Sequence, residues 1–91
     1  MAANSKIRFY KDGKQVRFQL NGDFDGSMAL QLIGMIGDHC GRSDAVVIDT
    51  DDLRDLLPFG VEVFHKRLRT DLGFPLHCRV VGSKSALLQP H

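Results

Sequence analysis

The sequence of 91 residues contains little cysteine and no long apolar segment. Two cysteines, Cys40 and Cys78, are too few for the disulfide framework of a small secreted domain, and each lies in an apolar pattern typical of a buried thiol. No apolar run approaches the roughly 20 residues that a membrane-spanning helix needs, and no apolar signal segment is found at the N-terminus. We therefore expect a soluble, cytoplasmic protein with free thiols.

An excess of charge of one sign is also absent. Twelve Lys and Arg residues balance eleven Asp and Glu residues, which gives a formal net charge of +1 at pH 7. This balance provides no overall field that would attract nucleic acid or an anionic membrane. Hydrophobic residues make up 43% of the chain, so we expect residues 1–91 to form a single domain with one modest core and no structural metal or cofactor.

Alternating apolar residues predict an antiparallel hairpin near the N-terminus. Residues 7–10 and 15–20 flank an Asp-Gly pair, a strong signal for a tight turn between two strands. The period of two along each strand directs one set of side chains toward the core and the other set outward. The predicted core set is Ile7, Phe9, Val16, Phe18 and Leu20.

A first helix is predicted from a cap at Asp25 or Ser27 to about Gly41, because apolar residues recur there at helical spacing. Gly34 and Gly37 each cost such a helix about 1 kcal/mol relative to Ala, so we expect close packing on the sheet to account for them. The apolar positions of this helix are Ala29, Leu32, Ile33, Ile36 and Cys40.

The second half of the chain predicts two more strands and a second helix. Residues 45–48 form a continuous apolar run typical of a buried strand, and residues 78–81 form the last strand. Pro58 suits the first position of a helix that runs to about Leu72. Residues 83–88 can add one helical turn, but the chain end leaves it unsupported, so 1–5 and 83–91 are expected to be frayed. The buried stripe of the second helix is Val61, Phe64, Leu68 and Leu72.

The predicted order is β-β-α-β-α-β, which indicates an α/β fold with a four-stranded mixed sheet. Strand-helix-strand crossovers make the second, third and fourth strands parallel to one another.

Three segments of this pattern carry motifs of one known family. The first is Leu20-Asn21-Gly22-Asp23-Phe24-Asp25, which is similar to a strand that ends in a turn before the first helix. The second is residues 47–53, similar to a buried strand followed by an Asp-Leu turn. The third is Leu57-Pro58-Phe59-Gly60, which aligns with an Asp-Ser-Ser/Gly-Gly motif at the start of the second helix. Together, the three segments resemble the STAS domains of bacterial anti-sigma-factor antagonists.

The resemblance implies a sheet with both helices packed on one face and a regulatory loop at the N-terminus of the second helix. The function that it implies is non-enzymatic binding of a signalling protein, such as an anti-sigma factor or a kinase-like partner, by a monomer or weak dimer. Pro58 occupies the position of the phosphoacceptor serine and has neither a hydroxyl nor a backbone N–H. The predicted partner-binding residues are Leu56, Leu57, Pro58, Phe59, Gly60 and Asp25, with Leu56, Leu57 and Phe59 as exposed apolar surface.

A magnesium site or a small phosphatase-like domain is the alternative interpretation. The carboxyl ends of parallel strands meet at one edge of a sheet, and carboxylates gathered there are suitable ligands for Mg²⁺. The same residues also shape turns and cap helices, which is the commoner role of aspartate and the one that we favour. The predicted edge contains Asp23, Asp25, Asp49, Asp51 and Asp52.

Two further clusters admit a functional and a structural interpretation. The pairs His39-Cys40 and His77-Cys78 offer zinc ligands, but adjacent residues on a strand point to opposite faces, so buried cysteines beside surface histidines are favoured. The hairpin concentrates basic residues that could bind single-stranded nucleic acid, but a strand edge protected against strand addition explains them without a ligand, and we favour this interpretation and expect no nucleic acid partner. These basic residues are Lys6, Arg8, Lys11, Lys14 and Arg17, with Tyr10 among them.

Overall fold

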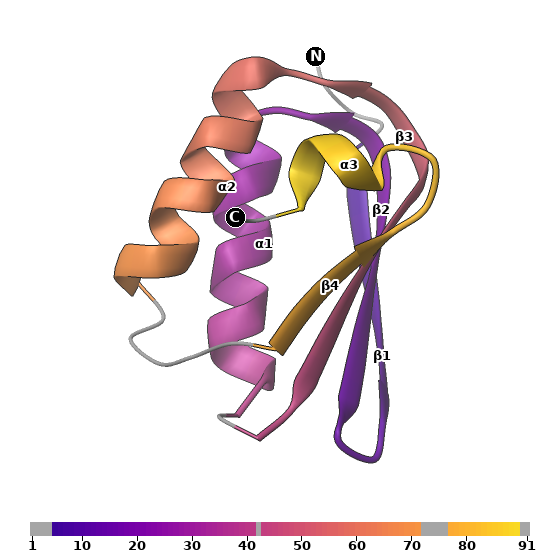
Figure 1. The fold of residues 1–91 in the computed structure, drawn as a ribbon, viewed down its shortest axis with the longest axis vertical. Helices are drawn as coiled ribbons and strands as arrows, with labels where there is room; N and C mark the ends of the chain where they lie inside the picture. Colours follow the sequence, from indigo (N-terminus) through magenta and orange to yellow (C-terminus); the bar gives the residue numbers. More distant parts are fainter. Residues whose placement is uncertain (1–4, 42, 72–76, 90–91) are drawn as a thin grey trace.

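The fold is an α/β arrangement in which helices cover a four-stranded sheet (Figure 1). We describe it from a computed structural model, which covers residues 5–41, 43–71 and 77–89. No helix in this part of the chain is long and apolar enough to cross a membrane. The elements are β1 (Lys6–Asp12), β2 (Gln15–Phe24), α1 (Gly26–His39), β3 (Ala45–Leu56), α2 (Pro58–Asp71), β4 (His77–Val81) and α3 (Ser85–Leu88).

The strands lie in the order β1-β2-β3-β4, and the predicted hairpin and the predicted strand directions are confirmed. β1 is antiparallel to β2, whereas β2, β3 and β4 are parallel to one another. Phe9 pairs with Phe18, Phe18 with Ile48, and Ile48 with Val80, so one row of apolar residues crosses all four strands. Gly13 has a φ of 62° in the turn of the hairpin, a conformation that favours glycine.

Both central strands continue beyond their predicted ends at residues 20 and 48. β2 reaches Phe24 through two shifts of register, and β3 reaches Leu56. Aspartate disfavours strands, which is why the polar segment after Ile48 was predicted to be a turn. Within β3, however, the side chains of Thr50 and Leu53 are buried in the core, so the tertiary packing outweighs the local preference.

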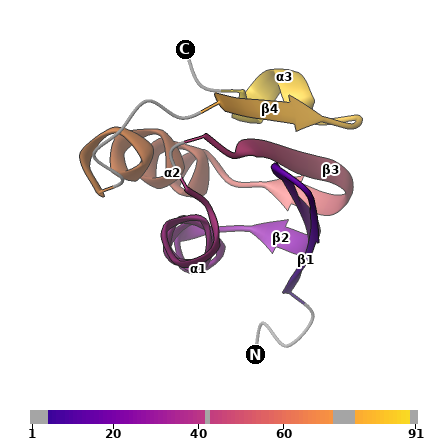
Figure 2. The same cartoon turned by 90° about the horizontal axis from the view of Figure 1, so that it is seen from below.

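The helices cover one face of the sheet, as the resemblance implied, and the core lies between the two layers (Figure 2). Asp25 caps α1, because its Oδ1 accepts a hydrogen bond from the N–H of Met28 at 2.9 Å. On α2, Phe64 is fully buried and its ring meets that of Phe24 edge to face, with 6.0 Å between centroids. The predicted stripe of α2 includes Leu72, which lies outside the described residues. The buried residues of α1 are Met28, Ala29, Leu32, Ile33 and Ile36.

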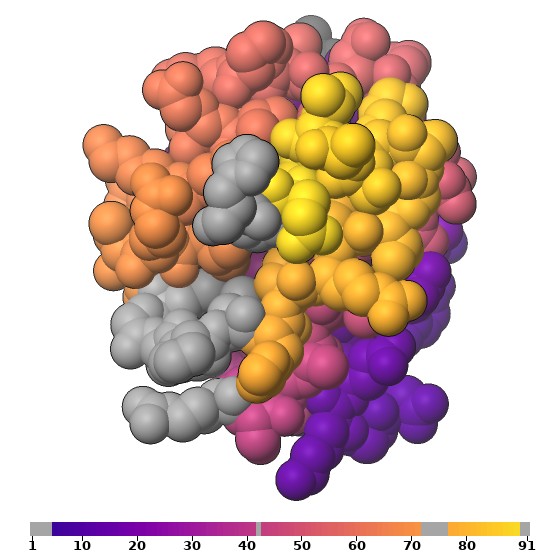
Figure 3. Space-filling view, in the orientation of Figure 1, coloured from indigo at the N-terminus to yellow at the C-terminus, as the bar shows by residue number. Residues whose placement is uncertain are grey.

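The segment after β4 differs from the frayed end that we predicted. α3 is a helical turn whose Leu88 is fully buried in the core. His65 Nε2 on α2 donates a hydrogen bond to the carbonyl oxygen of Leu88 at 2.8 Å, and the N–H of Val80 donates one to the side-chain oxygen of Gln89 at 3.0 Å. The turn is supported by these long-range contacts, which the local sequence does not reveal. In the space-filling view, β4 and α3 form one continuous surface on this side of the molecule (Figure 3).

The glycines of α1 also differ from the prediction. Gly34 and Gly37 are exposed and do not pack on the sheet. At Gly34, apart from its chain neighbours and the backbone of its own helix, no described heavy atom lies within 4 Å of the position that a Cβ would occupy. The buried stripe of α1 lies on another side of the helix, so the packing of the described residues gives no reason for glycine here.

Candidate partner-binding surface

The start of α2 packs against the junction between β2 and α1. The N–H of Leu57 donates a hydrogen bond to the carbonyl oxygen of Phe24 at 3.0 Å. A Cβ at Gly60 would lie 2.6 Å from the same oxygen and 2.8 Å from the carbonyl oxygen of Asp25. Only glycine allows this approach, so Gly60 is buried and fixes the first turn of α2 on the residue that caps α1. Two predicted site residues, Asp25 and Gly60, are therefore neighbours.

Phe59 is the most prominent apolar side chain of this region. It is 70% exposed, and Leu57 before it is 43% exposed. One side of the Phe59 ring lies on α1, because a Cβ at Gly26 would be only 3.0 Å from it. The ring is thus supported from beneath and open to solvent above. Pro58, the first residue of α2, is exposed as well.

The prediction that Leu56 is exposed is wrong. Leu56 is the last residue of β3, pairs with Phe24 on β2 and is partly buried against the core. Its different environment follows from the unexpected length of β3, which keeps this side chain on the sheet. Gly60, being buried, shapes the surface and presents no side chain to a partner.

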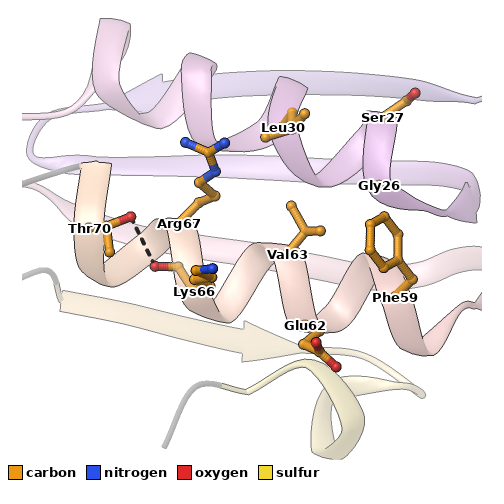
Figure 4. Close-up of a pocket in the computed structure, with 9 residues that line it drawn as sticks. All are labelled: Gly26, Ser27, Leu30, Phe59, Glu62, Val63, Lys66, Arg67 and Thr70. Atoms are coloured by element: carbon orange, nitrogen blue, oxygen red, sulfur yellow. Dashed lines mark hydrogen bonds between the residues drawn. The ribbon is translucent and has the colours of Figure 1, made fainter.

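A groove of about 700 Å³ extends from Phe59 along the outer side of α1 and α2 (Figure 4). Figure 4 shows Val63 and Arg67 pointing from α2 toward α1, whereas Glu62 points away from α1. Leu30 and Val63 were not predicted to belong to a site. Leu30 is an apolar residue of α1 outside the predicted buried stripe, and this position was the signal that could have identified it. The lining residues are Gly26, Ser27, Leu30, Phe59, Glu62, Val63, Lys66, Arg67 and Thr70.

A second, smaller groove of about 370 Å³ lies between α2 and α3. Leu87, which is 64% exposed, forms its α3 side. The first turn of α2 therefore has a hollow on each side. The lining residues are Leu56, Pro58, Val61, Glu62, His65 and Leu87.

The aspartates proposed as a magnesium site are engaged by other residues. Asp49, Asp51 and Asp52 lie within β3 and not beyond the end of a strand, and Asp25 serves as the cap of α1. Among the described residues, no group of three or more His, Cys, Asp or Glu side chains is placed to hold a metal ion. This arrangement favours the structural interpretation. The partners are Arg54 for Asp23 at 3.2 Å, Arg17 for Asp49 at 2.9 Å, the N–H of Ser83 for Asp51 at 2.8 Å and Gln19 for Asp52 at 2.9 Å.

The two cysteines lie at the edge of the core, and the histidines beside them are exposed. Burial, followed by the proximity of Cys40, raises the pKa of the Cys78 thiol to about 11. Burial also raises the pKa of Cys40, and the charge of Asp44 acts in the same direction. Protonated thiols are poor nucleophiles and poor metal ligands at neutral pH. His39 instead stacks on Phe9, with ring centroids 4.3 Å apart.

The basic hairpin contains two ion pairs. Lys11 lies 3.8 Å from Asp44, and Arg17 lies 2.9 Å from Asp49. Both partners of the second pair lie on the sheet face opposite the helices, where they join β2 to β3. Tyr10 is 54% exposed. Lys11 and Arg17 of the hairpin thus form ion pairs with aspartates elsewhere in the fold.

Sequence comparison identifies no relative of this chain. No family model matches it, and no curated protein matches it.

Comparison with solved structures identifies proteins of the same fold. The chain is similar to the antisigma-factor antagonist STAS domain from Rhodobacter sphaeroides, with a TM-score of 0.61 and 18% identity over 94% of this chain and 95% of that one. It is similar to an uncharacterized DUF3478-family protein with a SpoIIAA-like fold from Shewanella loihica PV-4, with a TM-score of 0.57 and 15% identity over 87% and 66% of the two chains. The chain is also similar to the protein Mglu, with a TM-score of 0.60 and 18% identity. This match covers 78% of this chain but only 18% of the length of Mglu. The likeness, at these identities, is one of fold, and the chain therefore has the STAS-like, SpoIIAA-like fold that the three sequence segments predicted.

Proposed function

We propose that this chain is a non-enzymatic regulatory module that binds a signalling protein through the loop and first turn of α2, without a cofactor. The observation that carries the proposal is the exposure of Phe59, which is 70% accessible although the backbone around it is tightly packed. An antisigma-factor antagonist shares the fold, which supports the same class of partner for this chain, an anti-sigma factor or a kinase-like protein.

A rigidly supported aromatic side chain is well suited to protein recognition. Aromatic residues at the centre of an interface commonly contribute ~2 kcal/mol or more to binding. The hydrogen bond of Leu57 to Phe24 and the burial of Gly60 fix the backbone on both sides of Phe59. Little conformational entropy is then lost when a partner covers the ring, because the segment is already ordered.

Regulation by a phosphate at the start of α2 is not part of this proposal. The segment Leu57-Pro58-Phe59-Gly60 contains no hydroxyl group. Pro58 also lacks the backbone N–H that would help to hold a phosphate at a helix N-terminus. We therefore expect this segment to remain unmodified after incubation with a serine kinase, and we expect partner binding to be independent of phosphorylation there.

The test is capture of partners from the native host with the tagged wild-type chain and two variants. Phe59→Asp places a charge at the proposed contact, and Tyr10→Asp makes the same change at an exposed aromatic residue on β1, away from α2. We expect the Phe59→Asp variant to lose a partner that both the wild type and Tyr10→Asp retain, as identified by mass spectrometry. The thermal midpoint of Phe59→Asp should stay within a few degrees of the wild-type value, as is usual for surface substitutions. Undiminished capture, or unfolding of the variant, would show that the docking site lies elsewhere.

A further inference from the structure

The groove between α1 and α2 is divided into an apolar half and a basic half. Leu30, Phe59 and Val63 form the half near the helix N-termini, and Lys66 and Arg67 lie in the half toward the C-terminus of α2 (Figure 4). Leu30 is 50% exposed and Phe59 is 70% exposed, so the apolar half is open to solvent.

The basic half is available to an acidic partner. Lys66 makes no ion pair with any residue in the described part of the chain. Arg67 pairs with Asp71 at 3.3 Å, and both side chains are largely exposed. An exposed i,i+4 pair of this kind contributes little to stability, so a partner carboxylate can replace Asp71 at little cost.

The length of the groove and the exposed surface of α1 beyond Leu30 match a helix. Phe59 and Thr70 are its outermost lining residues on α2, and the rise of an α-helix places them roughly 16 Å apart along the axis. About three turns of a partner helix cover this distance. Gly34 lies one turn beyond Leu30 on the same side of α1, and no described atom occupies the space above it. A helix backbone can approach α1 closely at this point.

We propose that this groove binds an amphipathic α-helix of a partner protein that carries an apolar stripe and, one to two turns farther along, acidic residues. The apolar stripe packs on Leu30, Phe59 and Val63, and the carboxylates pair with Lys66 and Arg67. This inference rests on the proposed function and extends it, because Phe59 belongs to both surfaces. It names the secondary structure and the charge of the partner segment and adds α1 to the interface.

The inference can be tested without knowing the partner, by selection from a displayed library of random peptides of about 16 residues, enough for roughly four helical turns. The wild-type chain is the target, and the Leu30→Asp variant is used to remove peptides that bind elsewhere. We expect the enriched peptides to have apolar residues at spacings of three and four together with Asp or Glu beside them, and to gain helical circular dichroism on binding. Enrichment of basic or proline-rich peptides, or no enrichment over Leu30→Asp, would overturn the inference.

Charge variants on α2 provide the matched control. Lys66→Glu should weaken binding of the selected peptides by about tenfold, the loss expected when a favourable contact becomes a repulsive one. Arg69→Glu makes the same change in charge on the same helix but outside the groove, and should alter affinity by less than about twofold. Equal effects of the two variants would mean that only the overall charge matters, which contradicts a defined groove. Thermal unfolding of each variant shows that the fold is retained.

Three other outcomes separate this inference from the proposed function or identify another occupant. In a parallel selection without depletion on Leu30→Asp, peptides whose binding depends on Phe59 but not on Leu30 or Lys66 would leave the docking site at the start of α2 intact and overturn the groove. A dimer in analytical ultracentrifugation that Leu30→Asp dissociates would show that a second copy covers this face. Binding to phosphatidylglycerol vesicles that Lys66→Glu abolishes would show that the face meets a lipid surface. Either of the last two results would overturn the inference.

Discussion

Gly60 and Gly34 are both helical glycines, yet replacement by alanine is predicted to change stability in opposite directions. Neither has a positive φ, so backbone strain plays no part in the comparison. A Cβ at Gly60 would lie 2.6 Å from the carbonyl oxygen of Phe24 and 2.8 Å from that of Asp25, whereas a Cβ at Gly34 would meet no described atom within 4 Å. The difference between the two sites is therefore one of packing.

The structure sets the sign and the size of each effect. Because contacts of a Cβ below 3.0 Å are essentially never found, Gly60→Ala must displace the first turn of α2 by about 0.4 Å or more. Overpacking costs about 1–3 kcal/mol, and three backbone contacts below 3.0 Å place Gly60→Ala in the upper part of this range, above the gain of about 1 kcal/mol in helix propensity. We expect a net destabilisation of about 1–2 kcal/mol for Gly60→Ala and a stabilisation of about 0.5–1 kcal/mol for Gly34→Ala.

Equilibrium unfolding in urea, followed by circular dichroism, measures both changes. With a slope of roughly 1 kcal/mol per M for a domain of this size, the midpoint should fall by about 1–2 M for Gly60→Ala and rise by about 0.5–1 M for Gly34→Ala. If Gly60→Ala is as stable as the wild type or more stable, the first turn of α2 is not fixed on the junction of β2 and α1. The support proposed for Phe59 would then be absent.

Three further predictions concern the core and its edges. Thr50→Val should lower the free energy of unfolding in urea by about 1–3 kcal/mol, because it removes the buried hydroxyl that accepts a hydrogen bond from the N–H of Lys84 at 3.1 Å. An unchanged midpoint would contradict that role. Leu88→Ala should lower the free energy of unfolding by about 2–4 kcal/mol, because Leu88 is fully buried. Leu87→Ala, at an exposed site on the same turn, should change it by less than about 0.5 kcal/mol. Equal effects of the two variants would mean that α3 does not close the core. Burial raises the pKa of the Cys78 thiol to about 11 in the folded chain, so the unfolded chain loses this proton at a lower pH. The free energy of unfolding should therefore fall by roughly 1 kcal/mol per pH unit between pH 9 and pH 11. This decrease should be smaller in Cys78→Ala, and an identical pH profile would show that the thiol is not protected by burial.

Part of the candidate surface was predictable from the sequence. Phe59 falls outside the apolar stripe of α2, so its exposure follows from helical periodicity, whereas Leu57 was predicted to be exposed because it precedes the helix. Leu56 did not follow this rule, because the unforeseen continuation of β3 holds it against the core. Leu30 and Val63 were missed because a groove between two helices depends on how the helices pack, which no single periodicity contains.

The order of the elements and the directions of the strands were determined by the sequence itself. Apolar residues repeat every second position in the strands and at helical spacing in the helices, and an Asp-Gly turn with two crossovers fixes the relative directions of the four strands. These signals are local, or they follow from the right-handed geometry of the chain, so they can be recognised without coordinates.

Tertiary structure alone decided where the strands end and how the chain closes. The segment after Ile48 is rich in aspartate and predicts a turn, yet it forms a strand because Thr50 and Leu53 are buried while its aspartates pair with residues of β2 and with Ser83. The last turn likewise has no local support and is held by the burial of Leu88 in a core formed by residues far away in the sequence. In both cases, the free energy gained from contacts between distant residues is larger than the free-energy cost of the locally unfavourable conformation. Such contacts exist only once the chain has folded.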